Sequence, residues 1–167
     1  MVLYLSAFTR QSRWEELSLG ALFRFDGLPP DQIAMKVEAL PGERGMLVLG
    51  SVTGGPYPAP WLGPMRDLAD ATLYGADRAH VVHPILLDTP IGKGAVVLPG
   101  DLLRGADDRY SVYVGDGAAI DLTSGRRRRA RFDADRVHKA WSMHWADQSY
   151  ADAFFLFPTP GGRELRL

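Results

Sequence analysis

The sequence contains no cysteine. Disulfide bonds, thiolate nucleophiles and cysteine-based zinc sites are therefore excluded as sources of stability or chemistry. A chain of 167 residues, of which 46% are hydrophobic, can bury a core without such covalent or metal staples. The absence of cysteine fits a reducing compartment, so the sequence predicts a cytoplasmic location.

Long apolar runs are missing as well. No stretch approaches the roughly 20 apolar residues of a membrane helix, so no membrane partner is expected. The opening stretch, residues 1–14, has a short apolar run with no basic residue before it and no clear small-residue cleavage site. It predicts a strand rather than a signal peptide.

Motifs for nucleotide or acyl-transfer chemistry are also absent. The pair Gly92-Lys93 could end a phosphate-binding loop, but Leu87 stands where the first glycine belongs and Gly94 where Ser or Thr belongs. No Gly-x-Gly-x-x-Gly fingerprint follows a strand, and no Gly-x-Ser-x-Gly elbow occurs. We therefore expect neither nucleotide-dependent nor α/β-hydrolase chemistry, and no cofactor.

Glycine and proline, by contrast, are frequent and separate many short apolar runs. The chain has 18 glycines and 12 prolines, a distribution typical of short strands joined by tight turns. The expected strands are 19–27, 33–40, 46–52, 79–88, 94–103, a hairpin over 109–125 and a last strand over 152–158. The first three have short connections, which predicts an antiparallel meander. Within 33–40, Ile33, Met35 and Val37 should share one face, and Gly-Asp-Gly should form the turn of the 109–125 hairpin.

Two segments carry apolar residues at helical spacing. The segment 64–74 has a proline in its first turn and a glycine after its last residue. The segment 134–149 has a stripe that includes Val137, Trp141 and His144, preceded by aspartates that can cap a helix. The predicted fold class is α+β but mostly β, with short antiparallel strands forming a small barrel or sandwich beside these two helices.

The length predicts a single domain over residues 1–167. Two sub-units within it, 14–53 and 90–132, show the same succession of an opening strand, a polar break, an alternating strand, a Gly-flanked turn and a closing strand. This likeness would fit a diverged duplication of a small barrel-like unit. Because glycine and alanine are common residues, we favour chance as its explanation.

Histidine and aspartate supply the candidates for catalysis. His80 and His83, together with Asp77 or Asp88, could provide a two-histidine, one-carboxylate metal site or a general base. In a strand, however, His80 and His83 point to opposite faces, which is poor geometry for chelation. We favour two strand histidines without a metal, and a catalytic site stays the alternative.

The stretch 54–64 predicts an extended surface loop, because three prolines fall within residues 56–60. Tyr57 and Trp61 form an aromatic pair in this loop, and such residues suit a contact surface. The alternative, in which Trp61 folds back as a plug under the following segment, is equally open.

Positive charge is concentrated in one segment. The net charge of the chain is −1, but residues 126–139 hold seven basic and two acidic residues. That segment therefore carries +5 and the remainder −6, an asymmetry that can mark an interaction surface.

Four of these basic residues, 126–129, are consecutive arginines. If the chain is extended there, Arg127, Arg129 and Arg131 form one outward column about 7 Å apart, while Phe132 anchors the opposite face. Such a column suits phosphates or an acidic protein surface. The simpler and favoured interpretation is an edge strand protected from aggregation by its charge.

Taken together, these features favour a non-enzymatic structural or protein-interaction module that assembles with itself or with another protein. Its predicted binding residues are Arg127, Arg129, Arg131, Tyr57 and Trp61. One alternative is a small metal-assisted hydrolase that uses the two strand histidines and an aspartate. Another is a nucleic-acid-binding module built on Arg126–Arg131, although stacking aromatics are missing from that run.

Overall fold

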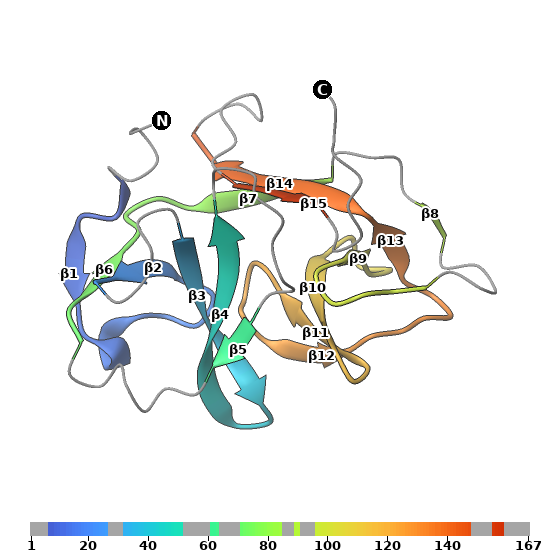
Figure 1. The fold of residues 1–167 in the computed structure, drawn as a ribbon, viewed down its shortest axis with the longest axis horizontal. Coiled ribbons are helices and arrows are strands. Elements are labelled where there is room, and N and C mark those ends of the chain that lie inside the picture. The colour runs from blue at the N-terminus through green and yellow to red at the C-terminus, as the bar shows by residue number, and fades with distance from the viewer. Residues whose placement is uncertain are drawn as a thin grey trace.

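A computed structural model of the chain describes residues 7–26, 32–51, 61–63, 71–84, 89–90, 96–147 and 155–158. Figure 1 shows two groups of strands side by side, with further strands crossing over both of them. Within the described ranges, no helix has the length and apolar character needed to span a membrane.

The described residues form short strands and one 3-10 turn, η2 (Trp14–Glu16). The strands are β1 (Arg10–Ser12), β2 (Leu22–Phe25), β3 (Gln32–Leu40), β4 (Glu43–Ser51), β5 (Trp61–Gly63), β6 (Leu73–Gly75), β7 (His80–Pro84), β8 (Thr89–Pro90), β9 (Leu102–Arg104), β10 (Tyr110–Gly115), β11 (Ala118–Asp121), β12 (Arg127–Arg129), β13 (Arg136–His138), β14 (Ala140–Trp145) and β15 (Phe155–Pro158).

The first sheet has the strand order β1-β6-β2-β3-β4-β5, and its neighbouring strands are antiparallel. The predicted meander of β2, β3 and β4 is therefore confirmed. The alternation expected along β3 is confirmed too, since Ile33, Met35 and Val37 all pack into the main core. Ala34 faces the other way, into a second cluster around Phe23.

The second sheet has the order β12-β11-β10-β9-β13-β8, again antiparallel. The predicted hairpin is confirmed as β10 and β11. It turns at Gly115, Asp116 and Gly117, where φ is +106°, +50° and +71°. These angles lie in the left-handed region, which glycine adopts readily and aspartate tolerates in turns.

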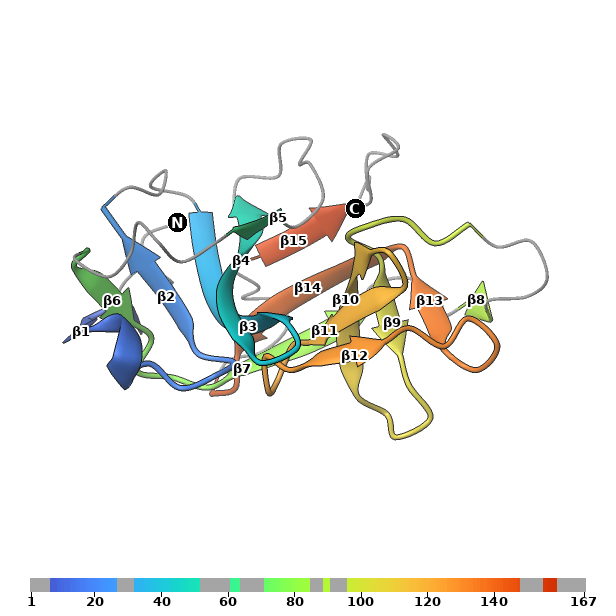
Figure 2. The same ribbon diagram turned by 90° about the horizontal axis from the view of Figure 1, so that it is seen from below.

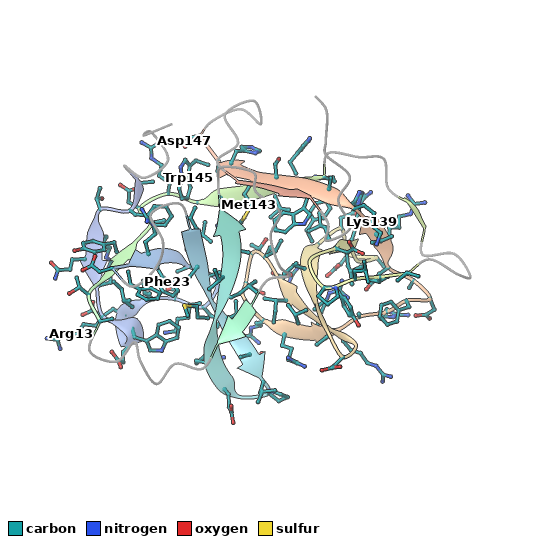
Figure 3. The ribbon with its side chains drawn as sticks, viewed as in Figure 1. Arg13, Phe23, Lys139, Met143, Trp145 and Asp147 are labelled. Carbon is teal, nitrogen blue, oxygen red and sulfur yellow. The ribbon has the colours of Figure 1, made fainter. Side chains whose placement is uncertain are left out.

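The third sheet, β15-β14-β7, lies across the other two (Figures 1 and 2). Its strand β14 pairs with β7 from Trp141 opposite Pro84 to Trp145 opposite His80. Figure 3 shows Met143 and Trp145 on β14, with Phe23 in the first sheet. The main core takes buried side chains from all three sheets, among them Leu22, Met35, Leu47, Leu102, Val112, Ile120, Trp141 and Trp145.

The first and second sheets have the same strand order. In each, a four-strand meander (β2 to β5, or β9 to β12) is extended beyond its first strand by a later strand (β6 or β13) and then by an earlier one (β1 or β8). The next strands, β7 and β14, pair with each other. The predicted sub-unit 90–132 contains all of β9 to β12, whereas 14–53 contains β2 to β4 but not β5, so a duplication stays a hypothesis.

The helix predicted over 134–149 is wrong. Its residues form β13 and β14, and all of Ala140–Met143 are buried. In β14 the large apolar residues Trp141, Met143 and Trp145 alternate with Ser142 and His144 and pack into the main core, so a strand pattern was present in the sequence. The spacing of Val137, Trp141 and His144 also fits one face of a helix, and this coincidence led to the wrong prediction.

The other predicted helix and the barrel are also corrected. At the end of the segment 64–74, Leu73 is 0% exposed and begins β6, between β1 and β2, while residues 64–70 lie outside the described part of the chain. In the described ranges the chain is nearly all β, in three antiparallel sheets of which none closes into a barrel. The α+β class is therefore wrong.

Two glycines, Gly20 before β2 and Gly125 before β12, lie in close contact where the first and second sheets meet. Gly20 N donates to Lys36 O at 2.7 Å, and Glu38 N donates to Gly125 O at 2.8 Å. The two glycines have φ of +84° and +68°. A Cβ atom on Gly125 would lie 2.5 Å from Gly20 N, so neither backbone leaves room for a side chain.

Candidate functional site, an arginine-lined groove

The arginine run begins at a tightly bonded turn. The carboxylate of Asp121 accepts hydrogen bonds from Thr123 N at 3.0 Å, Ser124 N at 2.6 Å and Ser124 Oγ at 2.8 Å. Aspartate favours turns because its side chain can bond the backbone in this way. After Gly125 the chain enters β12, which the sequence predicted as an extended edge strand, and β12 is indeed the end strand of the second sheet.

A groove of about 540 Å³ lies along β12. It lies between the β3–β4 and β10–β11 turns, and Figures 1 and 2 both place the β3–β4 hairpin tip beside β12. Its lining residues are Glu38, Pro41, Asp116, Gly117, Ala118, Arg127, Arg128 and Arg129. The volume falls within the roughly 300–1,000 Å³ of ordinary ligand sites.

Arg127 ties β12 to the first sheet. Its Nη1 donates to Ala39 O at 2.5 Å, and its backbone N–H makes a long contact of 3.4 Å with Glu38 Oε2. The guanidinium group is half-buried and shares its face of the strand with Arg129. Arg127 is therefore partly committed to the fold.

Arg128 points the other way and is fixed in the second sheet. Its Nε donates to Ser111 Oγ at 2.7 Å, and its Nη1 donates to Asp135 Oδ2 at 2.8 Å. Asp135 is nearly fully buried, and the same oxygen accepts the N–H of Arg131 at 2.9 Å. This arginine supports the wall of the groove and leaves little charge for a ligand.

Arg129 is exposed, and no hydrogen bond or ion pair engages its guanidinium group among the described residues. Arg131 is exposed as well, but it lies beyond β12 at the start of a turn, and its Nη2 lies 3.9 Å from Asp133 Oδ2. The predicted column of three arginines is therefore shortened to Arg127 and Arg129. Phe132, expected to anchor the strand, is 42% exposed and packs edge-on against Tyr113.

Glu38 and Asp116 bring negative charge into the same groove. The backbone N–H of Gly42 donates to Glu38 Oε1 at 3.0 Å and is the main cause that lowers the pKa of Glu38. The N–H of Arg127 and the charges of Arg44 and Arg126 lower this pKa further, so Glu38 is ionised at neutral pH. Sequence reasoning missed both acids, because it has no signal that brings two distant hairpin turns together.

The predicted catalytic residues do not converge in the described part of the chain. His80 points inward, where its Nε2 lies 2.6 Å from Leu122 O, and burial lowers its pKa. His83 is exposed on the opposite face of β7, as the alternation predicted. Asp77 is exposed near Arg78, and Asp88 lies outside the described residues.

No group of three possible metal ligands occurs among the residues that the structure describes. The hydrolase alternative therefore gains no geometric support. The aromatic pair of the proline-rich loop is not tested either. Tyr57 lies outside the described residues, and of Trp61 only the backbone is described, in β5 opposite Val48.

The function is consequently inferred from this arginine-lined groove. The groove combines positive side chains with two carboxylates, and it lies on the edge of a sheet. Comparison with known proteins adds no identification: no protein-family model, no curated protein and no solved structure matches the chain.

Proposed function

We propose that the chain is a non-enzymatic interaction module that binds an acidic segment of a partner protein in the groove along β12. The observation that carries this proposal is Arg129. It is an exposed cation on a sheet edge, it lines a groove of about 540 Å³, and none of the described acids pairs with it. A guanidinium group in this setting suits a carboxylate, which it can bind through two parallel hydrogen bonds.

Nucleic acid fits the groove less well. The lining includes Glu38 and Asp116, whose charges repel a continuous phosphate backbone, and it includes no aromatic ring on which a base could stack. A polypeptide can place single carboxylates beside Arg127 and Arg129 and avoid the acids. We therefore retain nucleic acid only as an outcome of the test.

Self-association through β12 is also disfavoured. Two copies that met at this edge would bring arginine against arginine, and like charges on facing strands are destabilising. The same positive charge attracts an acidic strand of a different protein. The arginines therefore disfavour a second copy of this chain and favour an acidic partner. That the chain meets this partner in the cytoplasm stays a prediction.

The test is a titration with a fluorescently labelled peptide rich in Glu. Arg129→Ala should weaken binding about three- to tenfold, and the loss should shrink as salt rises. Arg131→Ala should matter less, because that residue does not line the groove. The matched control is Arg109→Ala, which removes one exposed positive charge from the β9–β10 connection.

Equal losses for Arg129→Ala and Arg109→Ala would show only a general charge effect and would overturn the proposal. Tighter binding of a single-stranded oligonucleotide than of the peptide, at matched charge, would move the assignment to nucleic acid. Because Arg129 is exposed, its removal should leave folding unchanged, and circular dichroism checks this.

A further inference from the structure

The backbone of β12 offers a second kind of contact besides its arginine side chains. Ala130 N donates to Gly117 O at 2.8 Å, and Asp121 N donates to Arg126 O at 2.9 Å. Between these bonds, Arg128 lies opposite Ala119. The even-numbered positions of this segment therefore direct their backbone groups towards β11.

The odd-numbered positions must face the other way, because backbone groups alternate in direction along a strand. Arg127 and Arg129 thus direct their N–H and C=O groups to the free edge of the sheet. Two of these groups already have weak contacts, since Arg127 N lies 3.4 Å from Glu38 Oε2 and Arg129 O accepts Arg128 Nη1 at 3.2 Å. The Arg129 N–H and the Arg127 C=O have no hydrogen-bond partner among the described residues.

The neighbouring strand β3 covers only the start of this edge. Glu38 N donates to Gly125 O at 2.8 Å, in the manner of a neighbouring strand. Past that bond the chain turns at Pro41 and Gly42, and the groove opens between this turn and β12. The end of β3 therefore stops where an added strand could begin.

We infer that the acidic segment binds as an added β-strand, with its backbone on the edge of β12 and acidic side chains at every second position. This inference rests on the proposed function and specifies its ligand. An edge with both donors and acceptors suits a polypeptide, which carries both, whereas phosphates carry acceptors only. Side chains repeat about every 6.8 Å along both strands, so alternate acids oppose Arg127 and Arg129.

Two synthetic peptides of equal charge and composition test this inference. Each has about eight residues, with Glu and Thr alternating in one and grouped into two blocks in the other. The alternating peptide should bind about tenfold more tightly, because only it can match the spacing of the arginines while its backbone pairs with β12. N-methylation of one alternate set of its amides should remove this advantage, and methylation of the other set should not, because only one set faces the protein.

The outcomes separate the inference from the proposed function. If the alternating, block and both N-methylated peptides bind equally and all depend on Arg129, the groove is an acidic-segment site but strand addition is overturned. If none of the peptides depends on Arg129, the proposed function itself fails. In the expected case, hydrogen exchange of the Arg129 amide also slows when the alternating peptide is bound.

Discussion

The buried carboxylate of Asp135 accepts a hydrogen bond of 2.8 Å from Arg128 Nη1, so the second arginine of β12 is fixed to the body of its sheet. Its neighbour Arg129 has no such partner among the described residues. The adjacent residues Arg128 and Arg129 therefore have different roles. One maintains the strand, and the other is available to a ligand.

Arg128→Ala should consequently lower the free energy of unfolding by about 1–3 kcal/mol, because it leaves Asp135 buried without this cation. Arg129→Ala should change it by less than about 0.5 kcal/mol, as expected of an exposed side chain. Urea denaturation of both variants measures the difference. Equal effects would mean that the ion pair does not anchor β12.

The glycine contact between the first and second sheets gives a second prediction. Gly125→Ala should cost about 3 kcal/mol or more, because a Cβ atom there meets Gly20 N at 2.5 Å and φ is positive. Gly42→Ala is the matched control, with φ of +78° but nothing within 4 Å of its Cβ position, and should cost about 1 kcal/mol. Similar losses in thermal or urea unfolding would show that the close contact is absent.

The stability of the protein should depend on the protonation of His80. Burial lowers the pKa of His80, and the hydrogen bond to Leu122 O opposes this only in part. Because the folded state favours the neutral ring, this contribution to stability is complete above the ordinary histidine pKa of about 6.5 and is lost as pH falls through the lower folded value. Urea midpoints at neutral and acidic pH measure the loss.

His80→Gln should flatten this pH dependence relative to the unaltered protein. His83→Gln, at the exposed position on the other face of β7, should leave it unchanged. If both variants keep the difference in urea midpoint between neutral and acidic pH, the loss of stability in acid belongs to other groups.

Glu38 should weaken the binding of an acidic ligand. Its lowered pKa keeps it ionised at neutral pH, and its charge lies in the same groove as Arg129. Glu38→Gln should raise the affinity for a Glu-rich peptide about two- to fivefold, and its amide oxygen can still accept the Gly42 N–H. Glu15→Gln, on η2, makes the same charge change outside the groove, and an equal gain from it would refute a local role for Glu38.

The sequence was most informative where apolar and polar residues alternate along a strand that has one buried face. In β3, Ile33, Met35 and Val37 share the core face as predicted, and the Gly-Asp-Gly turn was placed correctly between β10 and β11. It failed at β14, although Trp141, Met143 and Trp145 alternate there with Ser142 and His144 and pack into the main core. There Trp141, which is 0% exposed, fitted a helical stripe equally well.

The groove could be predicted only in part. The sequence identified the arginine run as extended and at an edge, but it assigned equal outward roles to Arg127, Arg129 and Arg131. Local patterns cannot reveal that Asp135 holds Arg128, or that the turn carrying Pro41 lies across from β12. Those relationships depend on contacts between distant segments.

The most direct test of the acidic-segment site is nuclear magnetic resonance of the labelled protein during titration with the alternating Glu-Thr peptide. The amide signals of Gly117, Arg127 and Arg129 should shift together and saturate, while that of His83 on β7 stays in place. Shifts centred on β7, or no shifts at peptide concentrations that saturate fluorescence binding, would contradict the assignment of the groove as the binding site.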